Sequence, residues 1–325
     1  MTLNFTRILL IAIALSSAAG YAARPLGPPI AELFKNDNRI ARGVLVDRPA
    51  AQKITLRVDD YVYRSDVKTL TLNVDKEVFA SVTEGREYLV VFSRLQRNRL
   101  LRDQWEINPQ GPALVSVRGL GTPAIYASTE AIRTLLRPPE QRPELSADAA
   151  TGLLITLAEN SADGRARELG IFELYLRDDL QATISAANAR RFAVLAAAAG
   201  PRLKNFLLQA ATHFPKQRRE PWLSSAFRQS VADYGSVLEL NSYVPLLVKN
   251  ALLGLGGAAT ADDAQMITKH LYSNAPGVAR AALAALDAIA PHGALEAAKQ
   301  ALENQRIAPV TRRLLRRYIS QHGSE

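Results

Sequence analysis

The chain has 325 residues, of which 48% are hydrophobic and 22% charged, enough for two domains that each bury a core. Its formal net charge of +9 favours anionic surroundings, although the same balance also serves as a solubilising surface. The absence of cysteine excludes disulfides, thiol nucleophiles, cysteine metal sites and a lipoprotein anchor.

Residues 1–22 have the three parts of a secretory signal peptide. Arg7 supplies a positive charge, the apolar run ILLIAIAL follows, and Gly20 and Ala22 are the small residues before a cut ahead of Ala23. The apolar run is too short to cross about 30 Å of hydrocarbon, which favours cleavage over a membrane anchor. We therefore expect a periplasmic or secreted protein with no transmembrane segment in the mature chain.

A β-rich domain is predicted over residues 24–136. The segment ITLRVDDYVY, residues 54–63, alternates apolar and polar residues, with a step at Asp59-Asp60 that fits a β-bulge. The continuous apolar run YLVVF, residues 88–92, is typical of a central strand. Further strands are expected at residues 40–46, 70–74, 113–117 and 124–126. Short strands with turns between them indicate a small barrel or sandwich.

Three of these segments, ITLRVDDYVY, LTLNV and EGREYLVVF, resemble the netrin/TIMP-type module, a variant of the OB-fold barrel. The resemblance implies a small antiparallel β-barrel of OB-like form. The cysteines of that family are absent, so neither its disulfides nor its protease-inhibitory residues carry over to this chain.

The most basic stretch of this domain is RLQRNRLLR, predicted as a loop or short helix, with Arg94, Arg97, Arg99 and Arg102. OB-type barrels bind oligonucleotides or oligosaccharides through one face and its loops. Export argues against nucleic acid. The stretch is therefore either a patch that faces anionic headgroups or glycans, or a solvated basic loop.

The proline-rich segment RPPEQRP lies in a predicted linker, residues 137–145, and a helical domain is predicted over residues 146–323. Ser146 stands at a helix start, where its side chain can cap a free backbone amide, and Thr260, Asp262 and Asp263 lie in a segment expected to cap a later helix. Helices are expected at residues 129–136, 146–158, 163–176, 180–199, 201–213, 220–232, 243–253 and 260–271, and three more between residues 275 and 318.

The last helices repeat a pattern. A proline followed by valine, arginine and leucine occurs twice, about 32 residues apart: Pro276, Val278, Arg280 and Leu283, then Pro309, Val310, Arg312 and Leu315. The pattern resembles HEAT-type repeats, which implies an α-helical solenoid that binds other proteins and has no chemistry common to the family. The repeated arginine is expected to cap carbonyls or pair with an acid of the next repeat.

Four cations surround the final helix: Arg312, Arg313, Arg316 and Arg317. They either solubilise the end of the array and suit the helix dipole, or form part of a docking site for an acidic partner.

No catalytic, metal or cofactor motif is recognised. The four histidines lack metal-ligand spacing, and the glycine-rich stretch at residues 254–257 follows a helix, as a helix end does. We therefore expect a non-enzymatic exported scaffold or adaptor that binds another protein through its helical repeats. The alternatives are an envelope protein that binds anionic lipid or glycan through basic patches, and an enzyme with an unrecognised site.

Overall fold

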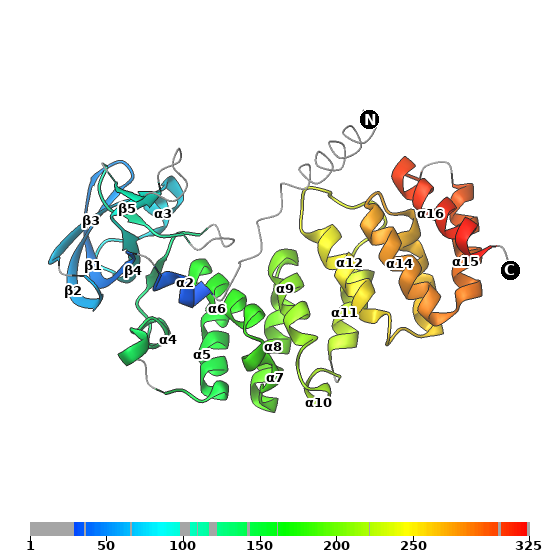
Figure 1. The fold of residues 1–325 in the computed structure, drawn as a ribbon, viewed down its shortest axis with the longest axis horizontal. Coiled ribbons are helices and arrows are strands. Elements are labelled where there is room, and N and C mark those ends of the chain that lie inside the picture. Colours follow the sequence, from blue (N-terminus) through cyan, green and yellow to red (C-terminus); the bar gives the residue numbers. More distant parts are fainter. Residues whose placement is uncertain are drawn as a thin grey trace, which may run out of the picture. The chain divides into compact units, whose positions relative to one another are not determined.

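The computed structural model describes residues 29–35, 37–65, 67–97, 105–108, 110–116, 122–141, 144–160, 162–220, 222–304 and 307–323. The leader expected at residues 1–22 lies outside these ranges. The described residues up to Leu180 form one compact unit, and those from Gln181 onward form a second (Figure 1). The domain limits given above remain a prediction.

The first unit contains a closed five-stranded barrel. Neighbouring strands follow the order β1-β2-β3-β7-β4, and β4 also pairs with β1, which closes the ring. All of these pairings are antiparallel except β3 with β7, and β8 adds to β4 outside the ring. A small antiparallel barrel of OB-like form is therefore confirmed. The strands are β1 (Arg39–Ala50), β2 (Lys53–Tyr63), β3 (Thr69–Asn73), β4 (Glu87–Ser93), β7 (Ala113–Leu114) and β8 (Ile125–Ala127).

The strand pattern of the sequence corresponds to the barrel register. Residue Arg42 pairs with Asp60 and the next residue, Gly43, pairs with Val58, so Asp59 is the extra residue of a bulge, as predicted. Gly43 is required there, since a Cβ atom would lie 2.3 Å from the carbonyl oxygen of Arg57. All five residues of the run YLVVF in β4 are buried, which confirms the central strand.

The basic stretch that follows β4 differs from the prediction. It begins as a strand, β5 (Leu95–Arg97), which forms an antiparallel hairpin with β6 (Trp105–Ile107). The strand is formed by backbone hydrogen bonding to β6, with Leu95 paired to Ile107, and the charged local sequence gives no sign of this pairing. A loop or short helix was therefore wrong for the first residues of this stretch.

Two buried carboxylates of the first unit make long-range contacts: Asp163 ties α6 to β8, and Glu173 ties α6 to α2. Asp163 caps α6 through the amides of Arg165 and Ala166, each 3.1 Å from Oδ1, while its Oδ2 accepts from the amide of Ala127 in β8 at 2.8 Å. Glu173 on α6 accepts from the amide of Ile30 at 2.9 Å. The helices are α2 (Pro29–Leu33), α3 (Lys76–Ser81), α4 (Glu130–Leu135), the 3-10 turn η1 (Pro139–Gln141), α5 (Ala147–Glu159) and α6 (Gly164–Leu176), with α7 (Asp178–Ala182) at the unit boundary.

The second unit is an array of helix pairs. Helices α9, α12, α14 and α16 pack in succession and form one layer. It is called the α9–α16 layer below, and it does not include α10, α11, α13 or α15. Helices α8, α11, α13 and α15 each pack against a member of that layer (Figure 1). The bounds are α8 (Ala186–Ala198), α9 (Pro201–Ala211), α10 (Lys216–Arg219), α11 (Leu223–Ala232), α12 (Val244–Leu255), η2 (Ala261–Asp263), α13 (Ala264–Thr268), η3 (Lys269–Tyr272), α14 (Pro276–Ile289), α15 (Pro291–Glu303) and α16 (Pro309–His322).

A helical array after the barrel is therefore confirmed, with two corrections in detail. The helix expected at residues 180–199 is broken between α7 and α8, because Ser185 caps α8 by accepting from the amide of Asn188 at 3.2 Å. The expected helix at 260–271 consists of α13 between the two short 3-10 turns η2 and η3. None of the described helices is long and apolar enough to cross a membrane.

The register of the final repeat is also different. Pro276 and Pro309 both begin helices, which sets an offset of 33 residues rather than 32. Under this offset the buried Val278 corresponds to the buried Thr311, whose hydroxyl donates to the carbonyl of Ser273 at 2.9 Å. Val310, matched to Val278 by sequence, is 49% exposed. Counted from the opening prolines, Arg280 therefore corresponds to Arg313 rather than to Arg312, whereas Leu283 and Leu315 are both buried and keep the offset of 32.

Candidate functional site

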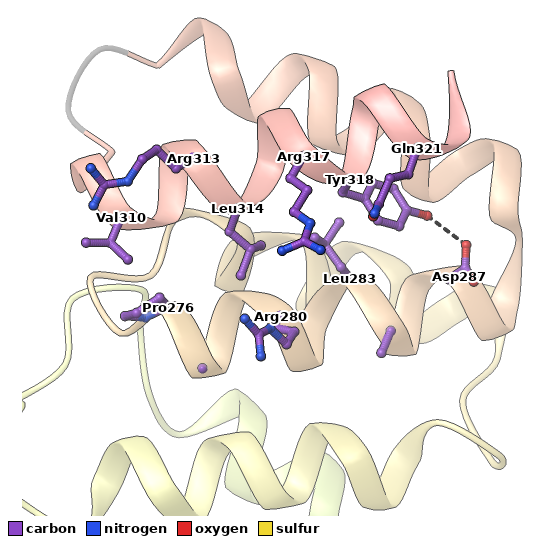
Figure 2. A pocket seen from close by; sticks show the side chains of 12 residues that line it. Pro276, Arg280, Leu283, Asp287, Val310, Arg313, Leu314, Arg317, Tyr318 and Gln321 are labelled. Atoms are coloured by element: carbon purple, nitrogen blue, oxygen red, sulfur yellow. Dashed lines mark hydrogen bonds between the residues drawn. The ribbon is translucent and has the colours of Figure 1, made fainter. Parts of the chain in front are cut away.

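A cleft of about 840 Å³ lies between α14 and α16, two neighbours of the α9–α16 layer (Figure 2). Its lining residues recur at intervals of three or four along each helix, so they occupy one face of each. They are Pro276, Gly277, Arg280, Leu283, Ala284 and Asp287 on α14, and Val310, Arg313, Leu314, Arg317, Tyr318 and Gln321 on α16.

The cleft has a cationic rim. Arg280, Arg313 and Arg317 are all exposed, and none of their guanidinium groups has an ion-pair or hydrogen-bond partner within the described part of the chain. Figure 2 shows Arg317 extending from α16 toward α14, where Arg280 lies. A guanidinium group presents a planar set of donors that matches a carboxylate or phosphate. The rim therefore suits an anionic group.

The floor of the cleft is apolar. Leu283 is 4% exposed and Leu314 is half-buried, while Val310 presents its side chain at the entrance. Alanine-rich packing brings α14 close to its neighbours, because Ala279, Ala282 and other small residues of this helix are buried. The cleft thus combines aliphatic contact surface with cations, as a site for a peptide segment does.

One end of the cleft is held by a polar link between the two helices. The hydroxyl of Tyr318 donates to Oδ1 of Asp287 at 2.7 Å (Figure 2). Burial, and secondarily this hydrogen bond and the charge of Asp287, raise the pKa of Tyr318 above its usual value. The Tyr318 ring also stacks on His322, with ring centroids 4.3 Å apart. The hydrogen bond fixes α16 against α14. It also occupies the carboxylate of Asp287, the acid among the lining residues.

The predicted basic patch of the last helix divides into two parts. Arg313 and Arg317 line the cleft, whereas Arg312 is half-buried and donates to the carbonyl of Asn304 at 3.0 Å. Arg316 is exposed and does not line the cleft. Arg280, which the sequence assigned to a structural role, faces the cleft instead. Its spacing from the helix-opening proline, equal to that of Arg313, is the signal that identifies it.

The predicted patch of the barrel is described only in part. Arg94 is exposed, and for Arg97 only its place in β5 is described. Arg99 and Arg102 lie outside the described residues. The described residues of this stretch define no site, and the patch remains a prediction.

A smaller hollow of about 320 Å³ beside the barrel is charged but internally paired. Arg42 lies 3.4 Å from Asp60 and 3.7 Å from Glu87, and Arg133 lies 3.7 Å from the same Glu87. Arg42 and Arg133 therefore have carboxylate partners within the protein. The arginines of the α14–α16 cleft have none, which makes that cleft the stronger candidate.

Several other polar groups have structural roles. Asp263 accepts from Arg228 Nε at 2.8 Å and closes a capping box with Thr260. Asp179 pairs with Arg177. His270 is buried with its Nε2 3.0 Å from the carbonyl of Val231, and burial lowers its pKa. Among the described residues, no cluster of three or more histidines and acids is placed to hold a metal ion.

Comparisons with known proteins gave no match to a family model, a curated protein or a solved structure.

Proposed function

We propose that this protein is a non-enzymatic exported adaptor that binds another protein through its helical array, and that the α14–α16 cleft is the docking site. The observation that carries the proposal is the set of three arginines, Arg280, Arg313 and Arg317, which surround an apolar floor without a partner in the described residues. Leaving such cations unneutralised at a recessed surface is consistent with an anionic ligand. Export follows from the predicted leader.

The finer family assignments belong to the same proposal. The two-layered helix packing and the proline-led helices with a cation at a fixed place support a HEAT-like solenoid. The strand order of the barrel, with EGREYLVVF leading into the buried β4, supports the netrin/TIMP-like assignment. In this proposal the barrel binds a second partner or positions the first.

An envelope polyanion, such as anionic lipid or glycan, is the second candidate because the same arginines suit it. The two differ in what must reach the floor of the cleft. A peptide segment contacts Leu314 through its side chains, whereas a polyanion bound at the rim depends on charge alone and is released steeply by salt.

The experiment is photocrosslinking from the cleft in living cells of the native host. A photoreactive residue replaces Leu314 in the full-length chain, and the products are identified by mass spectrometry. We expect a distinct protein to crosslink, and the product to be lost in Arg313→Glu and in Arg317→Glu, each introduced alone.

Arg316→Glu is the matched control, because it makes the same charge change on an exposed residue of the same helix outside the cleft. The crosslink should survive it. If Arg316→Glu lowers the crosslink yield as much as the cleft variants do, the effect comes from net charge and not from the cleft. The absence of any protein crosslink would contradict the proposed docking site.

A further inference from the structure

Three successive helices of the α9–α16 layer carry a basic residue at one equivalent place. Each of α12, α14 and α16 has a proline in its first two positions and a cation four residues further on. The pairs are Pro245 with Lys249, Pro276 with Arg280, and Pro309 with Arg313. Because α12 packs on α14 and α14 packs on α16, the three cations follow one another across the layer. We call Lys249, Arg280 and Arg313 the basic ladder.

Lys249 is continuous with the cleft. A Cβ atom at Gly277 would lie 3.7 Å from Cδ of Lys249, so the aliphatic part of this lysine rests over a glycine that itself lines the cleft. Lys249 is half-buried and has no ion-pair or hydrogen-bond partner within the described ranges. The surface therefore extends beyond the cleft by one helix.

The acids near the ladder do not neutralise it. Asp287 stands further along α14, two turns from Arg280, and its carboxylate accepts from Tyr318. Arg317, one turn beyond Arg313 on α16, adds a cation on the same side. The strip thus presents positive charge at each step from α12 to α16.

We infer that the ligand of this surface is an extended acidic segment of a partner protein, with a carboxylate at every third residue, lying across α12, α14 and α16. The inference rests on the proposed function, because it names the chemistry of the partner in the same cleft. Axes of packed helices lie about 8–10 Å apart. A polyproline II segment advances about 9 Å in three residues and returns to the same face with each turn. Its carboxylates therefore match the ladder.

A β-strand fits this spacing less well. Its side chains return to one face every second residue, so same-face groups lie about 7 or 13 Å apart, and neither value equals the distance between neighbouring helices. The apolar floor below the rim selects protein over a lipid surface or glycan, because Leu283 and Leu314 offer contact to aliphatic side chains or proline rings. An acidic, proline-containing segment matches the positive charges, the distance between neighbouring helices and the apolar floor of the cleft.

The test is fluorescence anisotropy with the full mature chain and labelled peptides. The main peptide repeats Glu-Pro-Pro, a second has the same composition with its glutamates in one block, and a third repeats Gln-Pro-Pro. We expect the first to bind about tenfold more tightly than the second, and the third not to bind, since each matched ion pair contributes up to about fivefold. Lys249→Glu, Arg280→Glu and Arg313→Glu should each weaken binding about three- to tenfold, and Arg316→Glu should not.

The outcomes separate this inference from the proposed function. If both glutamate peptides bind equally, or if Lys249→Glu has no effect while Arg313→Glu does, the basic ladder is overturned and the cleft remains a site for an anionic ligand. If neither glutamate peptide binds and the crosslink from position 314 is also absent, the proposed function falls with it. Vesicles of anionic lipid or a sulfated glycan that displace the peptide, bind more tightly and lose affinity with Lys249→Glu would overturn the choice of a protein ligand. Unchanged thermal midpoints show that each variant is folded.

Discussion

The buried carboxylate of Asp163 should be among the most sensitive positions of the first unit. It is 7% exposed and accepts three backbone amides, two from the first turn of α6 and one from Ala127 in the barrel. Asp163→Ala removes a helix cap, which costs about 0.5–2 kcal/mol. It also leaves the buried amide of Ala127 without an acceptor, which costs about 1–3 kcal/mol. We therefore expect a loss of about 2–4 kcal/mol in the free energy of unfolding.

The measurement is urea unfolding followed by hydrogen exchange of peptides that cover β8 and α6, which reports the first unit by itself. Ser146→Ala is the matched control, because Ser146 caps α5 through one amide, that of Ala149 at 3.2 Å, without reaching the barrel. It should cost about 1 kcal/mol. Asp163→Asn keeps one acceptor and should fall between the two. A loss for Asp163→Ala no larger than for Ser146→Ala would refute the structural role of the contact with Ala127.

Two further predictions concern packing and pH. Gly170→Ala should lower the free energy of unfolding by about 1–3 kcal/mol, because its Cβ would lie 2.6 Å from the carbonyl of Leu154, whereas Gly164→Ala, with open space around it, should be neutral or stabilising in the same urea titration. Two hydrogen bonds from Arg228 lower the pKa of Asp263 below 3.8. A carboxyl whose pKa is depressed in the folded state stabilises it above its unfolded pKa and loses that effect as the pH falls through the folded pKa. The destabilisation by Asp263→Asn should therefore be full at pH 7 and shrink below about pH 4, and a difference that is constant with pH would contradict this.

Local patterns predicted the elements of the barrel better than its closure. Alternation of apolar and polar residues located β2, which is buried on one face, and the continuous apolar run located β4, which is buried on both. Burial of this kind determines the type of each successive residue, so it can be recognised in the sequence. Closure depends on the parallel pairing of β3 with β7 at Asn73 and Ala113, which are distant in the chain. No local pattern encodes such a pairing, and the two-residue strand β7 is too short to show a period.

In the helical half, the sequence likewise predicted where helices begin better than which residues of two repeats correspond. Helix-opening prolines and capping residues such as Ser146 marked helix starts correctly, since both act within one turn. The match of Val278 to Val310 was wrong because it pairs a buried with an exposed residue, although the match of Leu283 to Leu315 from the same offset pairs two buried residues. Matching by that offset hid the equivalence of Arg280 and Arg313. The candidate cleft could therefore be found only once both helices were placed side by side.

The most direct test of the account is the crosslink yield from position 314 in Arg280→Ala, normalised to the amount of folded protein. If Arg280 had the structural role that its repeat position suggests, its loss would lower the free energy of unfolding and leave the partner's contact with folded protein unchanged. A docking role for Arg280 predicts the reverse: an unchanged urea midpoint, since this side chain is exposed and unpartnered among the described residues, and a marked loss of the crosslink. A full crosslink yield from Arg280→Ala would contradict it.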